Sequence, residues 1–312
     1  MPAMTLPEYA KGLEKTSIER PLIEAFAEQS DILQVIPFTG FTGGTYEGYR
    51  EADLGTAAFR AINEGATESR GKITPFQEPS MPIDTILKVD KAILLRHGDS
   101  RRAREEAMQV KRQSKLWTDT FLAGDNVTNP KEFNGIKARA TDANGRRIHN
   151  SVASGGGPLS LSKLDAAIIN TANPTHIIVP FDMQAPFIAA ARNTSISGFV
   201  IQSWDDVGRA KMTYAGLPIL HGYPKDKHGN ILPFNEVAFG GGSAVTSSLA
   251  VVSFTEEGLH GIQLKNIEVR DMGQLEDAVH FGTNVSWDVG LVDDGDFCLT
   301  VLDSITNAAI VA

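Results

Sequence analysis

Residues 100–125 read SRRAREEAMQVKRQSKLWTDTFLAGD, and this stretch decides the fold class. Small and apolar side chains recur along it at steps of four and three, at Ala103, Ala107, Val110, Ser114, Trp117 and Phe121. This spacing predicts a long helix with one buried stripe, which begins at a cap formed by Asp99 or Ser100 and ends before Gly124. At about 1.5 Å per residue, a helix over 99–123 is roughly 35 Å long.

The start of this helix is basic, although the whole chain is acidic. From Arg96 to Lys115, seven Lys or Arg residues stand against three acidic residues, a net charge of +4, whereas the chain as a whole has a net charge of −9. An acidic chain has no general attraction for nucleic acid, but a local basic surface can bind an anion. A solvated helix face and a contact with an anionic partner both fit the pattern. The candidate contact residues are Arg101, Arg102, Arg104, Lys111, Arg112 and Lys115.

Upstream of the helix lies a glycine-rich stretch, GFTGGTYEGYREADLG at residues 40–55. A P-loop requires Lys and then Ser or Thr after its last glycine, because these side chains bind phosphate and magnesium. Here Gly48 is followed by Tyr49 and Arg50, so the motif is absent and no nucleotide site is expected.

Residues 41–86 instead predict two strands that enclose a long polar excursion, and the alternating stretch 81–95, MPIDTILKVDKAILL, predicts one or two strands. The excursion has too few bulky apolar residues to form its own core, and ordered loops of this length are uncommon unless they are functional. We therefore expect it to project and contact a partner. The candidate contact residues are Tyr46, Glu47, Tyr49, Arg50, Phe59, Arg70, Lys72 and Phe76.

The amino-terminal residues predict an arm with one short amphipathic helix. Residues 17–33, SIERPLIEAFAEQSDIL, place Ile18, Leu22, Phe26 and Leu33 at nearly helical spacing. Polar or proline-bounded segments flank this helix, so its apolar stripe needs another surface, which another subunit could supply. The first residues lack a secretory signal and no apolar run approaches the ~20 residues of a membrane span, so we expect neither Sec export nor a membrane partner.

Downstream of the long helix the sequence predicts an α/β region. The Gly/Ser segment 154–160 is interpreted as a domain boundary. After it, helix, strand, helix and strand are predicted in turn over 160–173, 174–181, 182–193 and 215–224. Near the end, two strand-like stretches flank Asp294-Gly295, a pattern typical of a hairpin turn.

No combination of residues predicts catalysis, a cofactor or a metal site. His221 and His228 flank Asp226, but the surrounding Pro and Gly residues favour an exposed loop over a zinc site. The acidic run 293–296 lacks the twelve-residue loop of a calcium site, and Cys298, the single cysteine, lies in an apolar strand pattern typical of a buried, inert thiol. We therefore expect a protein that is not an enzyme.

The order of these parts resembles the tailed-bacteriophage major capsid proteins of the Hong Kong 97-type (HK97-like) fold. The stretches that carry the resemblance are 100–125 with EFNGIKAR at 132–139, PTHIIVPFDMQAPFIAAARN at 174–193, YAGLPILHGYP at 214–224 and LKNIEVRDMGQLEDAVHFGTNVSWDVGLV at 264–292. The resemblance implies an α+β fold divided into an N-terminal arm, an extended loop, a peripheral domain with a spine helix, an axial domain and returning strands. The expected ranges are 1–40, 41–86, 87–153, 154–275 and 276–312.

By the same resemblance, the protein is expected to assemble in the host cytoplasm, as hexamers and pentamers, into a procapsid that matures into an icosahedral virion capsid around double-stranded DNA. The implied partners are the protein itself, a separate scaffolding protein, a portal protein, a decoration or cement protein, and packaged DNA through non-specific contacts. The spine helix is expected on the inner face. The axial loop is expected to carry His221, Lys225, Lys227 and His228.

Two alternatives stay open. Encapsulin-type compartments resemble the same fold and enclose cargo proteins in place of a genome. An α/β enzyme without a recognisable motif is the alternative from another class, and a ligand-dependent melting shift of a small oligomer would favour it.

Overall fold

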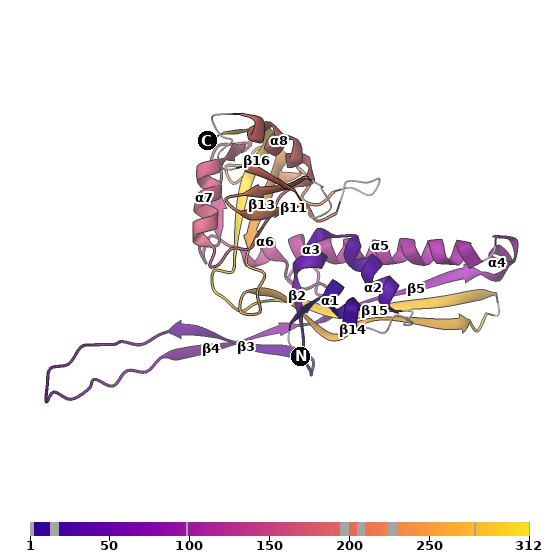
Figure 1. Ribbon diagram of the computed structural model, residues 1–312, viewed down its shortest axis with the longest axis horizontal. Coiled ribbons are helices and arrows are strands. Elements are labelled where there is room, and N and C mark those ends of the chain that lie inside the picture. Colours follow the sequence, from indigo (N-terminus) through magenta and orange to yellow (C-terminus); the bar gives the residue numbers. More distant parts are fainter. Residues whose placement is uncertain are drawn as a thin grey trace.

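The computed structural model describes residues 3–12, 19–97, 99–193, 200–204, 210–223, 230–277 and 279–311. Figure 1 shows an elongated part built on a five-stranded sheet, a second part built on a nine-stranded sheet, and a two-stranded hairpin that projects away from both. This mixture of sheets and a long helix confirms the predicted α+β class. Among the described residues, no helix is long and apolar enough to cross a bilayer.

The five-stranded sheet carries the long helix. Its strands, in spatial order, are β1 (Met4–Thr5), β2 (Pro37–Gly40), β14 (Leu259–Gln274), β15 (His280–Asp293) and β5 (Met81–Asp90). The long helix α5 (Asp99–Ala123) lies along β5 and β15, and its predicted range is confirmed. It ends before Gly124, as predicted, and only glycine fits there, because a Cβ would lie 2.5 Å from the carbonyl oxygens of Thr120 and Phe133.

An aromatic cluster holds α5 against this sheet. Trp117 stacks on Phe121 with ring centroids 5.2 Å apart, and Phe38 packs on Trp287 at 5.3 Å. These side chains are buried, together with Val110 and Ser114 of the predicted stripe. Ala107 is exposed, because the helix runs beyond the cluster at that end, and the side chain of Ala103 lies outside the described residues. The stripe is therefore buried over the second half of the helix.

The amino-terminal arm forms three helices, α1 (Leu6–Gly12), α2 (Glu19–Glu28) and α3 (Asp31–Val35). The prediction of a single helix over 17–33 is wrong, because the chain turns at Ser30. Asp31 donates its N–H to the carbonyl of Gly222 at 2.9 Å, and its carboxylate accepts the N–H of His221 at 2.7 Å. Ile18 and the side chain of Leu22 lie outside the described residues.

The apolar stripe of α2 is covered by the chain itself. Ile23 and Phe26 are buried, and Phe26 meets Trp287 edge to face at 5.2 Å. The expectation that another subunit supplies this surface is therefore wrong.

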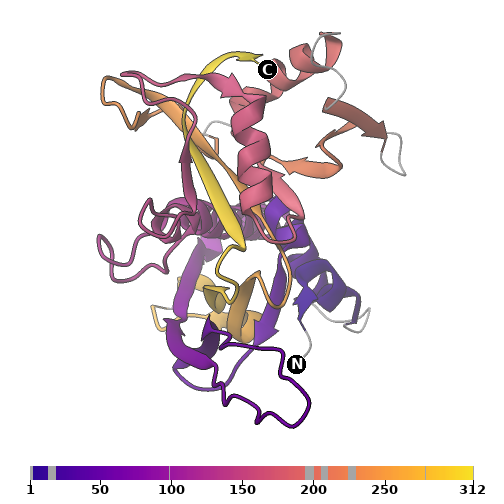
Figure 2. The same ribbon diagram turned by 90° about the vertical axis from the view of Figure 1, so that its left-hand side faces the viewer.

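The nine-stranded sheet forms the second part. Its main path contains β6 (Arg147–His149), β16 (Leu299–Val311), β13 (Ala244–Val252), β8 (His176–Ile178), β11 (Leu217–Leu220), β10 (Ala210–Tyr214) and β9 (Val200–Trp204), and it also includes β7 (Gly157–Ser160) and β12 (Glu236–Val237). The helices α7 (Leu161–Asn170) and α8 (Gln184–Arg192) pack on β16, and a 3-10 turn, η1 (Phe181–Met183), precedes α8 (Figure 2). The predicted helices and strands of this region are confirmed.

The Gly/Ser segment lies inside this sheet. β7 occupies its second half and pairs in parallel with β16, and β6, which comes earlier in the chain, pairs with the same strand. The side chain of Asn150 secures the segment by donating to the carbonyls of Gly157 and Pro158 at 3.2 and 2.8 Å. The segment interpreted as a domain boundary therefore contributes a strand to the same sheet as the residues before and after it.

Two further strand predictions are wrong. β15 and β16 do not form a hairpin, because β15 pairs with β14 and β5 whereas β16 pairs with β13, β6 and β7, so Asp294-Gly295 joins the two sheets. Residues 91–95 do not extend β5 but begin helix α4 (Lys91–His97). The carboxylate of Asp90 accepts the N–H of Ala92 at 2.6 Å, as an N-cap does.

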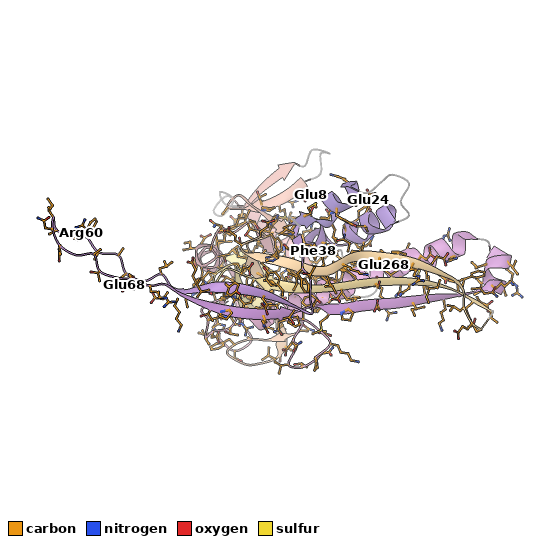
Figure 3. The ribbon with its side chains drawn as sticks, turned by 90° about the horizontal axis from the view of Figure 1, so that it is seen from below. Glu8, Glu24, Phe38, Arg60, Glu68 and Glu268 are labelled. Atoms are coloured by element: carbon orange, nitrogen blue, oxygen red, sulfur yellow. The ribbon has the colours of Figure 1, made fainter. Side chains whose placement is uncertain are left out.

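The projecting hairpin consists of β3 (Thr45–Asp53) and β4 (Lys72–Pro79), which confirms two strands enclosing a polar excursion. In Figure 3, Arg60 and Glu68 lie on the connection well away from the rest of the molecule. After Pro79 the chain enters β5, which lies in the five-stranded sheet and crosses the expected loop boundary at residue 86.

Candidate functional site

The base of the hairpin is the point where all three parts of the molecule meet. Along β3, Tyr46, Gly48 and Arg50 are at least partly buried, whereas Glu47 and Tyr49 are exposed. This alternation is that of a strand with one face on the protein. The hairpin is therefore docked at its base and free along its length.

Asp293, at the end of β15, is the centre of the contact. Its side chain is only 4% exposed, and its carboxylate accepts hydrogen bonds from the guanidinium groups of Arg139 and Arg146. Arg50 of β3 forms a third ion pair with it at 3.0 Å. Arg139, at the end of helix α6 (Ile136–Arg139), also donates to Glu78 of β4 at 2.7 Å. Both strands of the hairpin thus contribute a charged partner to the buried cluster.

Within this cluster, all three nitrogens of the Arg139 guanidinium donate hydrogen bonds. Arg139 donates to the carbonyls of Asn134 and Leu291 at 2.9 and 2.7 Å, in addition to its two carboxylates. Burial alone would raise the pKa of Asp293, but the guanidinium of Arg139 and the neighbouring arginines outweigh it and hold this pKa below its ordinary value. The carboxylate therefore remains ionised, and its loss would leave arginines buried without a counter-charge.

A second layer of contacts lies beside this cluster. Tyr46 donates its hydroxyl to Asp294 at 3.4 Å and packs edge-on against the buried ring of His260, with centroids 6.0 Å apart. Nδ1 of His260 lies 3.9 Å from Asp294. Burial raises the pKa of Tyr46 and of Asp294, and it lowers the pKa of His260 although Asp294 opposes that change.

The histidine environments predict a fold that loses stability in mild acid. Burial lowers the pKa of His260 and of His221, so the unfolded chain takes up protons near pH 6.5 while the folded chain resists. Stability therefore falls as pH drops below about 6.5, by up to about 1.4 kcal/mol per pH unit for each histidine. Asp294 acts in the opposite sense, because its raised pKa makes the folded state bind a proton first.

Melting temperatures at pH 7.5 and 5.5 measure this loss of stability, and H260N and H221N should each reduce the difference between the two temperatures. An unchanged pH dependence in the double variant would contradict this assignment.

Gly48 is required by a close approach. A side chain there would place its Cβ 2.3 Å from the ring of Phe76 and 3.1 Å from Asp294, and Arg50 covers that ring with its guanidinium 4.4 Å from the centroid. Glycine at position 48 therefore makes room for an aromatic ring.

G48A should accordingly destabilise the protein by about 1–3 kcal/mol, the usual cost of overpacking. The matched control is G44A, because a side chain at Gly44 would meet nothing within 4 Å. Urea unfolding of both variants tests this expectation. Equal stability of G48A and G44A would show that Phe76 moves away without cost.

The structure brings only part of the predicted loop residues together. Tyr46, Arg50 and Phe76 meet at the base, and Glu47 accepts a hydrogen bond from Gln77 at 3.0 Å. The remaining predicted residues are exposed along the hairpin and its connection: Tyr49, Phe59, Arg70 and Lys72.

The predicted basic residues of α5 point in several directions. Arg102 is ion-paired within the chain, to Glu106 at 3.0 Å and Asp271 at 2.7 Å. Lys115 lies over the ring of Tyr223, with its ammonium 4.4 Å from the centroid. The exposed residues of the set are Arg104, Lys111 and Arg112, and the side chain of Arg101 lies outside the described residues.

The other sequence candidates show no chemical site in the described part of the chain. His221 is partly buried at the Asp31 contact, whereas Lys225, Lys227 and His228 lie outside the described residues. Cys298 is buried, as predicted, and burial raises the pKa of its thiol to about 12. No group of three or more His, Cys, Asp or Glu side chains is placed to hold a metal ion within the described ranges.

The central residues of the buried cluster are absent from the sequence-based candidates. Arg139, Arg146 and Asp293 lie in polar segments that read as a helix exit and as a turn. The pairs are separated by 154 and 147 positions, so no local spacing connects them. The one sequence signal for this cluster was Asp293 itself, a charged residue that directly follows the apolar stretch ending at Val292.

The comparisons with known proteins agree with this architecture. The family described as major capsid protein GP7 matches residues 14–186, more than half of the chain. No curated protein matches the sequence significantly. Among solved structures, the SrpI encapsulin of Synechococcus elongatus PCC 7942 is 16% identical, with 90% of this chain and 89% of that chain covered and a TM-score of 0.64. A chain from Mycobacterium phage Adephagia is 12% identical, with 96% and 97% covered and a TM-score of 0.61. A chain from the procapsid of satellite phage P4 is 14% identical, with 94% and 93% covered and a TM-score of 0.53.

These likenesses confirm the expected Hong Kong 97-type fold along nearly the whole chain. The match over residues 14–186 spans α2 and α3 of the arm, both strands of the hairpin, the long helix and the strands β6, β7 and β8 of the nine-stranded sheet. The chain therefore belongs to the family of major capsid protein GP7.

Proposed function

We propose that this major capsid protein builds an icosahedral shell of hexamers and pentamers around a double-stranded DNA genome, first as a procapsid and then as a mature capsid. The observation that carries the proposal is the hairpin, which is anchored at its base by buried charges and bare along its connection. Leu54, Phe59 and Ile62 on that connection are almost fully exposed. Such side chains favour an interface with another subunit, because an isolated projection cannot bury them.

A hairpin of this kind suits a lattice of identical subunits. The anchored base sets the direction in which the projection leaves the subunit. Gly43 and Gly55 flank β3, and a Cβ added at Gly43 would meet nothing within 4 Å. A head-to-tail contact between the projection and the next copy closes into rings, and rings of five and six build a closed shell.

The remaining partners follow from the same proposal. Portal, scaffolding and decoration proteins and packaged DNA are its partners, and assembly takes place in the host cytoplasm. The basic face of α5 is proposed to lie inside the shell, and the loop after His221 at the axis of a hexamer or pentamer. The acidic subunit is proposed to enclose the DNA without binding it tightly, since strong contacts with the phosphates would oppose release of the genome. We propose that the protein is not an enzyme.

The test is negative-stain electron microscopy of the purified protein, alone and with any scaffolding protein encoded beside its gene. The expected result is closed shells or rings of five and six subunits. A uniform monomer or dimer in both preparations would refute the proposal.

An encapsulin-type compartment is the second candidate, favoured by the TM-score of 0.64 to the SrpI encapsulin. The content of particles made in the native host distinguishes the two. Nuclease-protected double-stranded DNA supports the capsid, whereas a bound cargo protein without DNA supports the compartment.

A further inference from the structure

β5 forms a long free edge of the five-stranded sheet within the described part of the chain. It pairs with β15 along its whole length, from Met81 opposite Val289 to Asp90 opposite His280, and its other side stays unpaired. In Figure 3 it is the purple strand that continues from the hairpin along the margin of the molecule. Every second residue of an edge strand directs its N–H and C=O away from the sheet, so β5 offers a ten-residue template for another strand.

The two faces of β5 differ in their surroundings. Its odd-numbered residues face α5, and Thr85 accepts a hydrogen bond from Gln113 of that helix at 3.0 Å. The even-numbered residues up to Lys88 are exposed, and Ile86 among them is 51% exposed. Asp84 lies two positions before Ile86 and Lys88 lies two positions after it, and within the described residues neither charge forms an ion pair.

This order of acid, apolar residue and base is complementary to itself when it is read in the opposite direction. In an antiparallel pair centred on Ile86, the two isoleucines lie opposite each other, and Asp84 of each copy lies opposite Lys88 of the other. Opposite residues of antiparallel strands have Cβ atoms about 4.5–5.5 Å apart, close enough for an apolar contact and for two ion pairs. One two-fold axis relates the two ion pairs, as in every isologous interface.

Other registers of the same two strands lose this match. Centring the pair on Asp84 or on Lys88 places two like charges opposite each other, which destabilises a sheet. Centring it on Thr85 or on Leu87 places no aspartate opposite a lysine. The charges therefore specify one register, and a shift of the strands is opposed by the side chains themselves.

We infer that two copies of the chain pair through the free edges of β5, antiparallel and centred on Ile86, so that their two five-stranded sheets become one continuous sheet. The inference rests on the proposed function for the use of this contact, because rings of subunits must also be joined to one another before a shell closes. The contact is separate from the one proposed for the hairpin connection, since β5 shares no residue with it.

The residues that protect this edge from other strands admit a second copy. Charged residues and proline on an edge oppose pairing with foreign strands. In the centred pair, Pro82 lies opposite Asp90 at the end of the strand, so its missing N–H removes at most one hydrogen bond per copy. A second copy neutralises Asp84 and Lys88, whereas a strand without the same order leaves both without a counter-charge.

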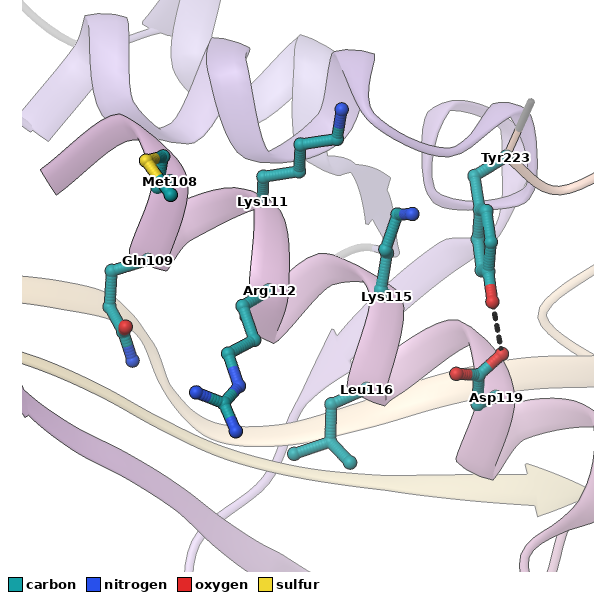
Figure 4. Close-up of a pocket in the computed structure, with 8 residues that line it drawn as sticks. All are labelled: Met108, Gln109, Lys111, Arg112, Lys115, Leu116, Asp119 and Tyr223. Carbon is teal, nitrogen blue, oxygen red and sulfur yellow. Dashed lines mark hydrogen bonds between the residues drawn. The ribbon is translucent and has the colours of Figure 1, made fainter. Parts of the chain in front are cut away.

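An apolar side chain beside this edge supports an occupant there. A groove of about 240 Å³ runs beside the first half of β5, and Leu116 of α5 lines it together with Met81 and Ile83. Leu116 is 51% exposed, and Figure 4 shows it beside Arg112, on the side of α5 opposite Lys111. A second sheet placed against β5 covers this leucine, which the subunit alone leaves in water.

Disulfide trapping between copies of the full-length protein tests the pairing, in free subunits and in assembled shells. I86C should form a covalent dimer with itself, because the two thiols lie opposite each other across the two-fold axis. D84C and K88C should each stay unlinked alone, since equivalent residues are then about 13 Å apart along the strands, and they should link to each other when the variants are mixed before assembly. The matched control is I169C on α7, where Ile169 is 84% exposed in the nine-stranded part. The natural cysteine, Cys298, is buried.

Charge reversal tests the register in the I86C background. D84K or K88D alone should reduce the yield of covalent dimer at least tenfold, because each places like charges opposite each other, whereas D84K/K88D should restore the yield to within threefold. E268K is the control for a reversed charge, since Glu268 is exposed on β14, two strands away from the free edge (Figure 3). It should change the yield less than threefold. Circular dichroism and melting curves show whether each variant is folded.

A yield of dimer from I86C no higher than that from I169C would overturn the inference. Self-linking of D84C equal to that of I86C would overturn it as well, and so would a double reversal without recovery. Electron microscopy of the same preparations separates the two proposals. Closed shells without I86C dimers refute the pairing alone, whereas I86C dimers in a protein that forms no rings or shells refute the capsid proposal and leave the pairing.

Discussion

Replacing Asp293 with asparagine lowers the free energy of unfolding by about 3–5 kcal/mol, because it leaves buried arginines without their counter-charge. The side chain is 4% exposed and serves Arg50, Arg139 and Arg146 together. Asparagine has nearly the same size as aspartate, but only one oxygen of its side chain accepts hydrogen bonds, and that oxygen is neutral. Its NH₂ group would face the guanidinium N–H groups, which are donors as well. Urea unfolding measures the loss. In a shell assay, D293N should yield few regular particles, since the hairpin loses the anchor that sets its direction.

The matched control is Asp296, three positions along the chain. Its side chain is 60% exposed and lies 4.0 Å from Arg146, so D296N should cost less than about 1 kcal/mol. If D293N and D296N unfold at the same urea concentration, the buried cluster does not anchor the hairpin.

Replacing residues 54–71 with Asn-Gly should leave a folded protein that no longer closes shells. Asp53 and Lys72 pair across the two strands, so a two-residue turn can join them without changing the register. The removed segment carries Leu54, Phe59 and Ile62, which contribute exposed apolar surface and no buried core. The melting temperature should therefore stay nearly unchanged, whereas electron microscopy should show subunits or small oligomers in place of shells.

A deletion of the whole hairpin is a poorer experiment, because it also removes Arg50 and Glu78 from the buried cluster. The finer control is the double substitution F59S/I62S, which keeps the length of the connection and removes two of its three bulky apolar side chains. It should weaken assembly less than the Asn-Gly replacement does. Regular shells from the Asn-Gly variant would contradict the role of the connection as an assembly contact.

Together these variants separate two properties of the hairpin. D293N acts on the base, where buried charge couples the hairpin to both sheets, and so it changes stability and assembly at once. The Asn-Gly replacement acts on the connection, whose bulky apolar side chains are exposed, and so it changes assembly alone.

The basic residues of α5 and the buried cluster differ in how far the sequence could predict them. The basic character of α5 is evident from Arg96 to Lys115. That Arg102 turns inward to Asp271 while Arg112 faces outward depends on which side of the helix meets β14 and β15. Local spacing indicates that a helix has two faces, but only packing decides which cation is neutralised.

The sequence by itself determined the elements whose signals are local. The 3.6-residue period and Gly124 specify α5 to its observed bounds, and the two strands around a polar excursion follow from composition and alternation. Local signals failed where partners are distant: the turn at Ser30, the link at Asp294-Gly295 and the strand at Gly157–Ser160. Each of these depends on a contact with a residue far along the chain, which no window of neighbouring residues contains.

Only the tertiary structure decided the cluster around Asp293. Three partners of Asp293 come from β3, α6 and the segment before β6, and Glu78 of β4 joins the cluster through Arg139. Charges so far apart in sequence meet only in the folded chain. The physical reason is that a buried ion pair contributes no local preference for helix, strand or turn. Its energy depends on desolvation and on geometry in three dimensions, and both exist only in the folded chain.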